Sequence, residues 1–266
     1  MIGVFDSGYG GLSVFKELVK TFPGQSFMYL GDNARAPYGI RSSEIVTEYV
    51  KEAVTWLFGH GATTIVLACN TASAEALPSL QKDFLPKEFP GKIVLGVIEP
   101  TVEFVEKNVS KENVIAVIGT PATIRSGAYG RAFANLGFTN VVEWATPLLV
   151  PLVETGTVSG PMAEHIIADA LSPLTRKGVD AVVLGCTHYY FLRDTIQKLY
   201  PHLKLFDASL AFPSYFKTFL ESHSESFGNK KFPSLSFYTT DEEEGFAHFV
   251  EDRLGFSILP SRVKLT

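Results

Sequence analysis

The chain has 266 residues, of which 46% are hydrophobic and 19% are charged, and its formal net charge is −5. This length allows one large domain or two modest ones, and the hydrophobic share is enough for a buried core. The acidic balance argues against a nucleic-acid partner held by general electrostatics, and no apolar run reaches the roughly 18 residues that a membrane span needs.

The amino terminus leads directly into a predicted strand. Residues 1–6 contain neither the basic region nor the long apolar stretch and cleavage site of a signal peptide. We therefore expect a cytoplasmic protein with no membrane partner, in which the cysteines stay reduced rather than forming a disulfide.

Strands and helices alternate from the start of the chain. A strand at residues 2–5 leads into the loop Asp6-Ser-Gly-Tyr-Gly-Gly11, and a helix at 12–21 follows. The glycines allow a tight turn that brings backbone amides close to a ligand, and a helix N-terminus favours an anion such as a carboxylate. The loop is not a Walker phosphate loop, because no Gly-Lys-Ser/Thr follows it. The alternative is a tight turn that binds nothing.

A second strand, at residues 27–30, ends in the turn-forming loop Gly31-Asp-Asn-Ala-Arg-Ala-Pro-Tyr-Gly39. Asp32, Arg35 and Tyr38 are candidates to meet a polar substrate there. The next predicted elements are an amphipathic helix at 42–60, a strand ending at Cys69, a helix at 72–81 and a strand at 92–97.

The pattern restarts around Pro100. The predicted elements are a helix from Val102, a strand at 114–118, a small-residue loop at 119–127, a helix at 127–136, a strand at 141–143, the stretch 147–158, a helix at 161–176 and a strand ending at Cys186. After Asp207 we expect a helix at 210–221, a turn region, a strand at 235–239 and a helix at 242–254. The last strand and helix are expected to dock on the first half.

The shared order of elements in the two halves predicts an α/β fold. We expect two similar three-layer lobes with mostly parallel sheets, facing each other across a central active-site cleft. The first lobe comprises residues 1–98 and 210–266 and carries Cys69. The second comprises residues 99–209 and carries Cys186.

The two cysteines lie in matching stretches, Ile65-Val-Leu-Ala-Cys-Asn-Thr-Ala72 and Val182-Val-Leu-Gly-Cys-Thr-His-Tyr189, and the chain has no other cysteine. Such aliphatic runs are typical of strands buried on both faces of a parallel sheet. Each cysteine then follows the carboxyl end of its strand, where open α/β sheets bind ligands. A free cysteine is often just a buried residue, but two matching sites favour a function.

Two thiols on facing lobes can invert a carbon centre without a cofactor. One removes a proton and the other returns one to the opposite face, and a thiol pKa near 8.5 suits both roles. The weakly acidic α-hydrogen of an amino acid also requires directed hydrogen bonds and exclusion of water. The candidates to hold substrate carboxylates are Ser7, Asn70, Thr71 and Thr187. Asp6 and His188 are candidates to adjust the thiols, although His188 could instead only cap backbone groups.

Other chemistries fit these residues less well. A cysteine–histidine hydrolase leaves the second cysteine without a role. Pyridoxal phosphate requires a Schiff-base lysine in a site loop, and the lysines fall mostly in charged helices and surface turns. Cys69, Cys186 and His188 lack the close paired spacing of a structural zinc site. We therefore expect neither metal nor cofactor. A binding protein without enzymatic activity is the alternative of another class.

At these motifs the sequence resembles the glutamate racemases, within the amino-acid racemases that need no cofactor. The matching stretches, in family order and spacing, are 6–11, 31–39, 69–72, Gly96-Val-Ile-Glu-Pro100, 119–126 with Tyr129, and 185–189. Two positions depart from the family pattern. Tyr190 replaces a usual proline, and Thr146 replaces a cysteine that many members have.

The resemblance implies specific roles. Cys69 would be the base for D-glutamate and Cys186 the base for L-glutamate, with Asp6, Glu154 and His188 assisting proton transfer. It also implies a cytoplasmic homodimer that supplies D-glutamate for peptidoglycan. The implied substrate-binding residues are Asp6, Ser7, Tyr38, Gly39, Asn70, Thr71, Thr187 and His188.

Overall fold

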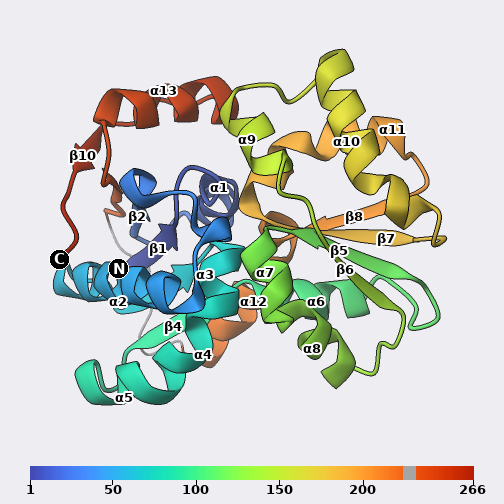
Figure 1. Ribbon diagram of the computed structural model, residues 1–266. Helices are drawn as coiled ribbons and strands as arrows, with labels where there is room; N and C mark the ends of the chain where they lie inside the picture. The colour runs from blue at the N-terminus through green and yellow to red at the C-terminus, as the bar shows by residue number, and fades with distance from the viewer. Residues whose placement is uncertain (224–231) are drawn as a thin grey trace.

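The computed structural model describes residues 1–223 and 232–266 and contains two parallel β-sheets (Figure 1). The strands are β1 Ile2–Asp6, β2 Phe27–Gly31, β3 Thr64–Leu67, β4 Ile93–Gly96, β5 Ile115–Gly119, β6 Val141–Ala145, β7 Ala181–Gly185, β8 Lys204–Asp207, β9 Leu235–Thr239 and β10 Pro260–Arg262.

Helices of varied length connect these strands. They are α1 Leu12–Thr21, α2 Ser43–Gly59, α3 Asn70–Glu75, α4 Leu77–Ser79, α5 Leu85–Glu88, α6 Ile98–Glu106, α7 Pro121–Ser126, α8 Ala128–Asn135, α9 Leu149–Glu154, α10 Gly160–Thr175, α11 Arg193–Leu199, α12 Ala208–Ser222 and α13 Glu243–Leu254. Three short 3-10 segments, η1 Asn33–Arg35, η2 Tyr38–Ile40 and η4 Thr187–Leu192, and a π-helical segment, η3 Leu80–Phe84, complete the list.

The two sheets repeat one topology, which confirms the predicted α/β class. The first sheet has the order β10-β9-β2-β1-β3-β4 and the second has the order β6-β5-β7-β8, and every described strand pair is parallel. In each sheet the chain starts at a central strand, β1 or β5, and forms the neighbour on one side, β2 or β6. It then crosses over to form the neighbour on the other side, β3 or β7. The crevice at such a reversal is where open α/β sheets bind ligands. It lies at the carboxyl ends of β1 and β3 in the first lobe, and of β5 and β7 in the second.

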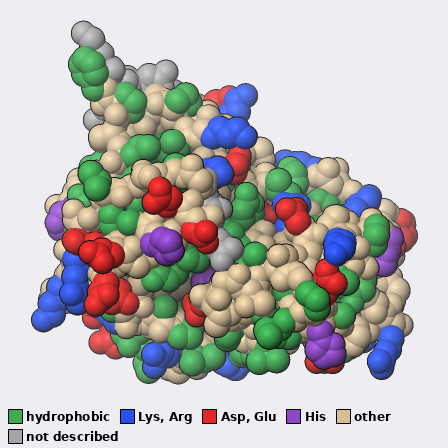
Figure 2. Space-filling model, turned by 90° about the horizontal axis from the view of Figure 1, so that it is seen from above, with side chains coloured by type: hydrophobic (Ala, Val, Ile, Leu, Met, Phe, Trp, Pro, Cys, Tyr) green, Lys and Arg blue, Asp and Glu red, His purple; other side chains and the backbone are tan. Residues whose placement is uncertain are grey.

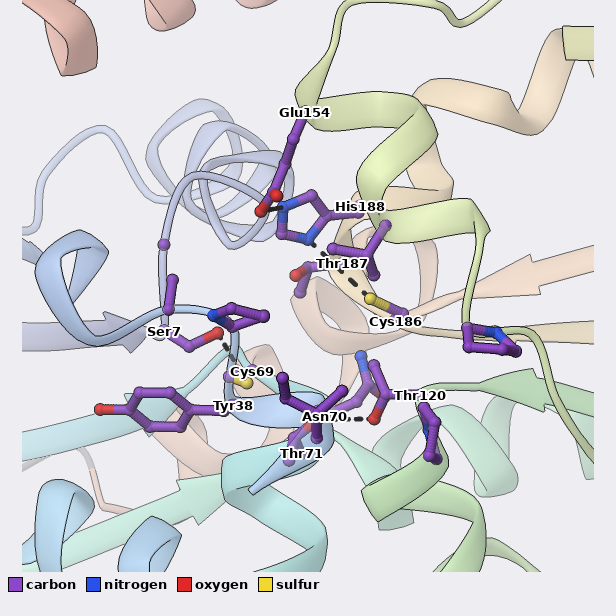
Figure 3. A pocket seen from close by; sticks show the side chains of 18 of the residues that line it. Ser7, Tyr38, Cys69, Asn70, Thr71, Thr120, Glu154, Cys186, Thr187 and His188 are labelled. Carbon is purple, nitrogen blue, oxygen red and sulfur yellow. Dashed lines mark hydrogen bonds and ion pairs between the residues drawn. The ribbon is translucent and has the colours of Figure 1, made fainter. Parts of the chain in front are cut away.

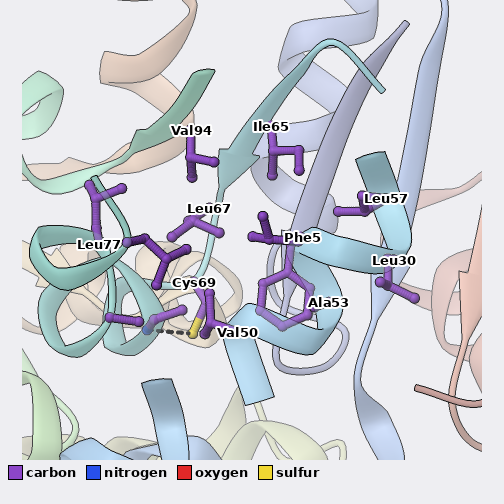
Figure 4. Close-up of a cluster of buried hydrophobic side chains, with 14 of the residues drawn as sticks. Phe5, Leu30, Val50, Ala53, Leu57, Ile65, Leu67, Cys69, Leu77 and Val94 are labelled. Carbon is purple, nitrogen blue, oxygen red and sulfur yellow. Dashed lines mark hydrogen bonds between the residues drawn. The ribbon is translucent and has the colours of Figure 1, made fainter. Parts of the chain in front are cut away.

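Apolar side chains cover both faces of each sheet. In the first lobe Phe5, Ile65 and Leu67 point from the strands onto Val50 and other apolar side chains of α2 (Figure 4). Burying one such side chain contributes about 1.5–3 kcal/mol. A second cluster, which includes Phe212 and Phe216 of α12, covers the opposite face of that sheet. The rigid cores hold the ends of β1 and β3 in place.

The C-terminal segment extends the first sheet. β9 pairs with β2 in the register Phe27↔Leu235. Helix α13 also approaches the second lobe, because the ring of Phe249 stacks on Tyr9 of the first lobe, with centroids 4.5 Å apart, and meets Phe191 of the second edge-on at 5.5 Å. Figure 2 shows the face that α13 and α10 form, where acidic side chains gather over the α13 side and basic ones are scattered.

Several boundaries differ from the sequence predictions. The predicted loop at 119–127 contains α7, because Thr120 caps the helix through the backbone N–H of Thr123, Pro121 suits the first turn, and Gly127 ends the helix at φ 64°. The stretch 147–158 likewise contains α9. The helices expected from Ala72 and Val102 begin earlier, at Asn70 and Ile98, while α11 and β8 were not predicted. The turn region between α12 and β9 lies partly outside the described residues.

Candidate active site

A cavity of about 180 Å³ lies between the lobes, at the carboxyl ends of the central strands (Figure 3). A water molecule occupies about 30 Å³ of liquid, so the cavity suits a small molecule. Its lining consists of Ser7, Gly8, Ala36, Pro37, Tyr38, Gly39, Ile40, Cys69, Asn70, Thr71, Thr120, Pro121, Thr146, Pro147, Val150, Pro151, Glu154, Cys186, Thr187 and His188. Both cysteines therefore face the same cavity, each from its own lobe.

Cys69 follows β3 and caps α3. Its Sγ accepts from the backbone N–H of Ala72 at 3.4 Å and lies 3.5 Å from Ser7 Oγ. Burial and the charge of Asp6 raise the pKa of this thiol to about 12, whereas the contacts with Ser7 and with the backbone N–H of Ala72 lower it. Cys69 is therefore a thiol at neutral pH and can donate a proton.

Cys186 follows β7 and contacts His188, which in turn contacts Glu154. Its Sγ lies 3.9 Å from Nδ1 of His188, and Nε2 of the same ring lies 3.3 Å from Oε1 of Glu154. That second contact is an ion pair without the alignment of a hydrogen bond. Burial alone would lower the pKa of His188, but the contacts with Cys186 and Glu154 and the charge of Asp6 raise it to about 10. At neutral pH an imidazolium thus stands beside the Cys186 sulfur.

Asp6 is fully buried at the end of β1, between the two thiol sites. Its Oδ2 accepts from the backbone N–H of Gly8 at 3.0 Å, and its Oδ1 accepts from the Thr187 hydroxyl of the other lobe at 3.3 Å. Burial raises its pKa, whereas His188 and these hydrogen bonds oppose the rise. A Cβ at Gly10 would lie 2.3 Å from Thr187 Oγ1, so only glycine lets the lobes approach this closely.

Asn70 and Thr71 lie at the start of α3 and contact the second lobe. Asn70 Oδ1 accepts from the Tyr129 hydroxyl at 2.6 Å, and its Nδ2 is buried without a partner in the described part of the chain. Thr71 Oγ1 lies 3.0 Å from Thr120 Oγ1 and 3.1 Å from Thr123 Oγ1. These are neutral hydrogen-bonding groups of the kind that can hold a carboxylate.

The loop at 31–39 contributes to the cavity less directly than predicted. The hydroxyl of Tyr38 donates to Asp32, which also accepts from Arg35 Nε at 2.7 Å and from Thr240 Oγ1 at 2.8 Å. Asp32 and Arg35 are not among the residues that line the cavity, and their contact with a substrate stays a prediction. Their polar groups instead hold the loop. Tyr38 and Gly39 do line the cavity, and any substrate hydrogen bond there would come from their backbone.

The sequence reasoning missed several lining residues. Thr120 directly follows β5, as Ser7 directly follows β1, so the internal repeat could have indicated it. The apolar wall of Pro147, Val150 and Pro151 carries no comparable signal. Thr146, at a departure from the family pattern, is buried, and its Oγ1 lies 2.8 Å from the Tyr189 hydroxyl. Tyr190, at the other departure, lies inside η4, and so does not prevent this segment from forming.

Charge in the cavity comes from few groups. His188 is the one basic side chain among the described residues that line it, and Glu154 the one acidic side chain. In the part of the chain that the structure describes, no group of three or more His, Cys, Asp or Glu side chains is arranged to hold a metal ion. No described helix is both long and apolar enough to cross a membrane.

Protonation of His188 predicts a pH-dependent stability. Its folded-state pKa lies above the ordinary 6.5, at about 10. The stabilisation is complete below about pH 6.5 and is lost as the pH rises through about 10. The difference in unfolding free energy between wild type and His188→Gln should therefore shrink by a few kcal/mol over that window in urea denaturation. The exposed His202→Gln serves as the control, and a difference for His188→Gln that stays constant with pH would contradict the charge assignment.

The protein has two α/β lobes, and one thiol from each lobe lines the cavity between them, as a two-base isomerase of small molecules requires. The family model described as Asp/Glu/Hydantoin racemase matches residues 2–211. The chain belongs to this family of racemases.

Named relatives and solved structures agree with the family. The glutamate racemase of Persephonella marina is 43% identical over 216 residues, which make up 81% of each chain. Glutamate racemase isoform RacE1 from Bacillus anthracis is 35% identical with a TM-score of 0.92, and the match covers 100% of this chain and 97% of that one. The Francisella tularensis glutamate racemase, solved in complex with D-glutamate, is 33% identical with a TM-score of 0.88, and the match covers 99% and 97%.

Proposed function

We propose that this chain interconverts L- and D-glutamate with Cys69 and Cys186 as its two bases. The observation that carries the proposal is the placement of one thiol per lobe at the strand ends around one small cavity. The named relatives are glutamate racemases at substantial identity, which supports glutamate as the substrate.

The reaction needs no net oxidant or reductant. With L-glutamate, the Cys186 thiolate takes the α-proton, and the electron pair of the C–H bond moves into the α-carboxylate as a carbanion-like intermediate. The Cys69 thiol then gives its proton to the opposite face, which produces D-glutamate. The roles reverse for the return reaction. The unpaired Nδ2 of Asn70, the hydroxyls of Ser7 and Thr71, and backbone amides are positioned to hold carboxylates.

His188, Glu154 and Asp6 prepare the thiols for this exchange. The imidazolium 3.9 Å from Cys186 supports negative charge on that sulfur. Glu154 in turn holds the proton on His188. The raised pKa of Cys69 keeps the opposite thiol protonated, as the donor of a proton to the α-carbon must be. A cysteine hydrolase needs one nucleophilic thiol, and would leave the second thiol, which lines the same cavity from the other lobe, without a role.

The physiological setting is part of the same proposal. A glutamate racemase in the cytoplasm would supply D-glutamate for peptidoglycan biosynthesis, and we propose that the chain works there as a homodimer. Size-exclusion chromatography with light scattering tests the dimer.

We expect the purified protein to racemise glutamate without added pyridoxal phosphate or metal. Dialysis against a chelator and a carbonyl reagent should leave the rate unchanged, because the thiols perform the proton transfers. Incubation of L-glutamate in heavy water, followed by chiral analysis and mass spectrometry, should show D-glutamate with deuterium at the α-position. A protein that binds glutamate in calorimetry yet incorporates no deuterium would be a binding protein, and activity restored only by a cofactor would also refute the proposal.

A further inference from the structure

Asn70 carries an unsatisfied hydrogen-bond donor at the cavity wall. The residue is only 2% exposed, and its side chain projects from the start of α3 beside Cys69 (Figure 3). The amide oxygen accepts a hydrogen bond, but Nδ2 has no partner among the described residues. A buried N–H group without a hydrogen-bond partner costs free energy, and a ligand that accepts a hydrogen bond from it removes that cost. A carboxylate only accepts hydrogen bonds, so it complements this group.

The partner of the amide oxygen comes from the other lobe. Tyr129 lies in α8, is fully buried, and donates its hydroxyl proton to Asn70 Oδ1 at 2.6 Å. An asparagine amide can turn by 180° and exchange its donor and acceptor faces. When the Tyr129 hydroxyl donates to Oδ1 of Asn70, the amide is held with Nδ2 on the side of the cavity. Burial raises the pKa of Tyr129 above its ordinary value, which keeps the hydroxyl proton in place at working pH.

We propose that Tyr129 is a positioning residue that directs the Asn70 amide donor of the first lobe toward a carboxylate of the substrate. The contact crosses the cleft, so the second lobe sets a binding group of the first, and that group is oriented only when the lobes are together. The inference rests on the proposed function for the identity of the carboxylate ligand, glutamate.

Other side-chain hydrogen bonds cross the cleft at this site, but they act differently. Thr71 contacts Thr120 at 3.0 Å and Thr123 at 3.1 Å, and Thr187 donates to Asp6 at 3.3 Å. In these contacts each hydroxyl already has a protein partner, which a substrate would have to replace. Among the contacts compared here, Tyr129–Asn70 is the one that leaves a donor with no partner in the described residues, and this separates positioning from simple closure of the lobes.

The test is a double-mutant cycle on binding. Tyr129→Phe should raise KM for both glutamate enantiomers about tenfold, equivalent to about 1.4 kcal/mol, and should leave kcat within about twofold, as loss of uniform binding predicts. Asn70→Ala should raise KM at least as much. If Tyr129 acts through Asn70, Tyr129→Phe should raise KM no further in the Asn70→Ala background. Tyr200→Phe, which loses only a hydroxyl contact to the Ala168 carbonyl at 3.5 Å, should leave KM unchanged.

The outcomes separate the possible explanations. An unchanged KM in Tyr129→Phe, or effects that add fully in the double mutant, would overturn the proposal. Partial unfolding lowers kcat by reducing the active fraction but leaves KM unchanged, so it cannot imitate the expected result. The calorimetric Kd for D-glutamate should shift by the same tenfold. If the wild type binds glutamate without racemising it, the proposed function fails, while the shift in Kd still tests Tyr129.

Discussion

Replacing either cysteine by alanine or serine is expected to reduce glutamate racemisation by at least about 10³-fold. Each thiol faces the cavity from its own lobe, so each serves one side of the α-carbon, and racemisation needs both. A positioned acid or base contributes about 10²–10⁴-fold to a proton transfer. The measurement is polarimetry or chiral chromatography of both variants, after circular dichroism has confirmed that each is folded.

Elimination from a β-substituted glutamate analogue distinguishes the two thiols. Elimination needs a single base, so each variant should retain it for one enantiomer. Cys69→Ala should act on the L-analogue through Cys186, and Cys186→Ala on the D-analogue through Cys69. The two variants are matched controls for each other. If both prefer the same enantiomer, or if one keeps wild-type racemisation, the two-base assignment is wrong, whereas a hydrolase would need one cysteine and tolerate loss of the other.

Loss of the Asp6 charge should produce the next largest effect. Asp6→Asn is expected to lower kcat about 100-fold with KM within about threefold, because the carboxylate supports His188 and does not hold the substrate alone. Glu154→Gln should follow the same pattern with a smaller loss of about tenfold, since Glu154 is partly exposed at the edge of the cavity and acts through His188.

The pH profile of the Asp6 variant gives a second measurement. The Asp6 charge raises the pKa values of both Cys69 and His188, so both should fall in Asp6→Asn, and its kcat profile should shift to lower pH. Thermal melts control for loss of the Gly8 and Thr187 hydrogen bonds. An effect on KM alone would assign Asp6 to substrate holding.

The fold class and the pair of thiols could be predicted from the amino-acid sequence alone. A strand buried on both faces of a parallel sheet needs an unbroken aliphatic run. The runs before Cys69 and Cys186 have this character and a strand-like length, so they can be identified as strands without a structure. Because the two halves repeat, one rule placed both cysteines at strand ends. Short helices such as α7 were missed, since a proline and a capping threonine are turn formers as well as helix starts.

The polar groups that remain available to a ligand, in contrast, become apparent only once the two lobes are packed together. Tyr38 belongs to a loop that the sequence placed at the site, yet its hydroxyl donates a hydrogen bond to Asp32. Asp32 also accepts from Thr240, which lies 208 residues further along the chain. The Asn70 oxygen accepts from Tyr129 of the other lobe, and its Nδ2 has no partner within residues 1–223 and 232–266. Hydrogen-bond partners in a buried site are set by the closure of two lobes, and no local pattern of residues encodes that contact.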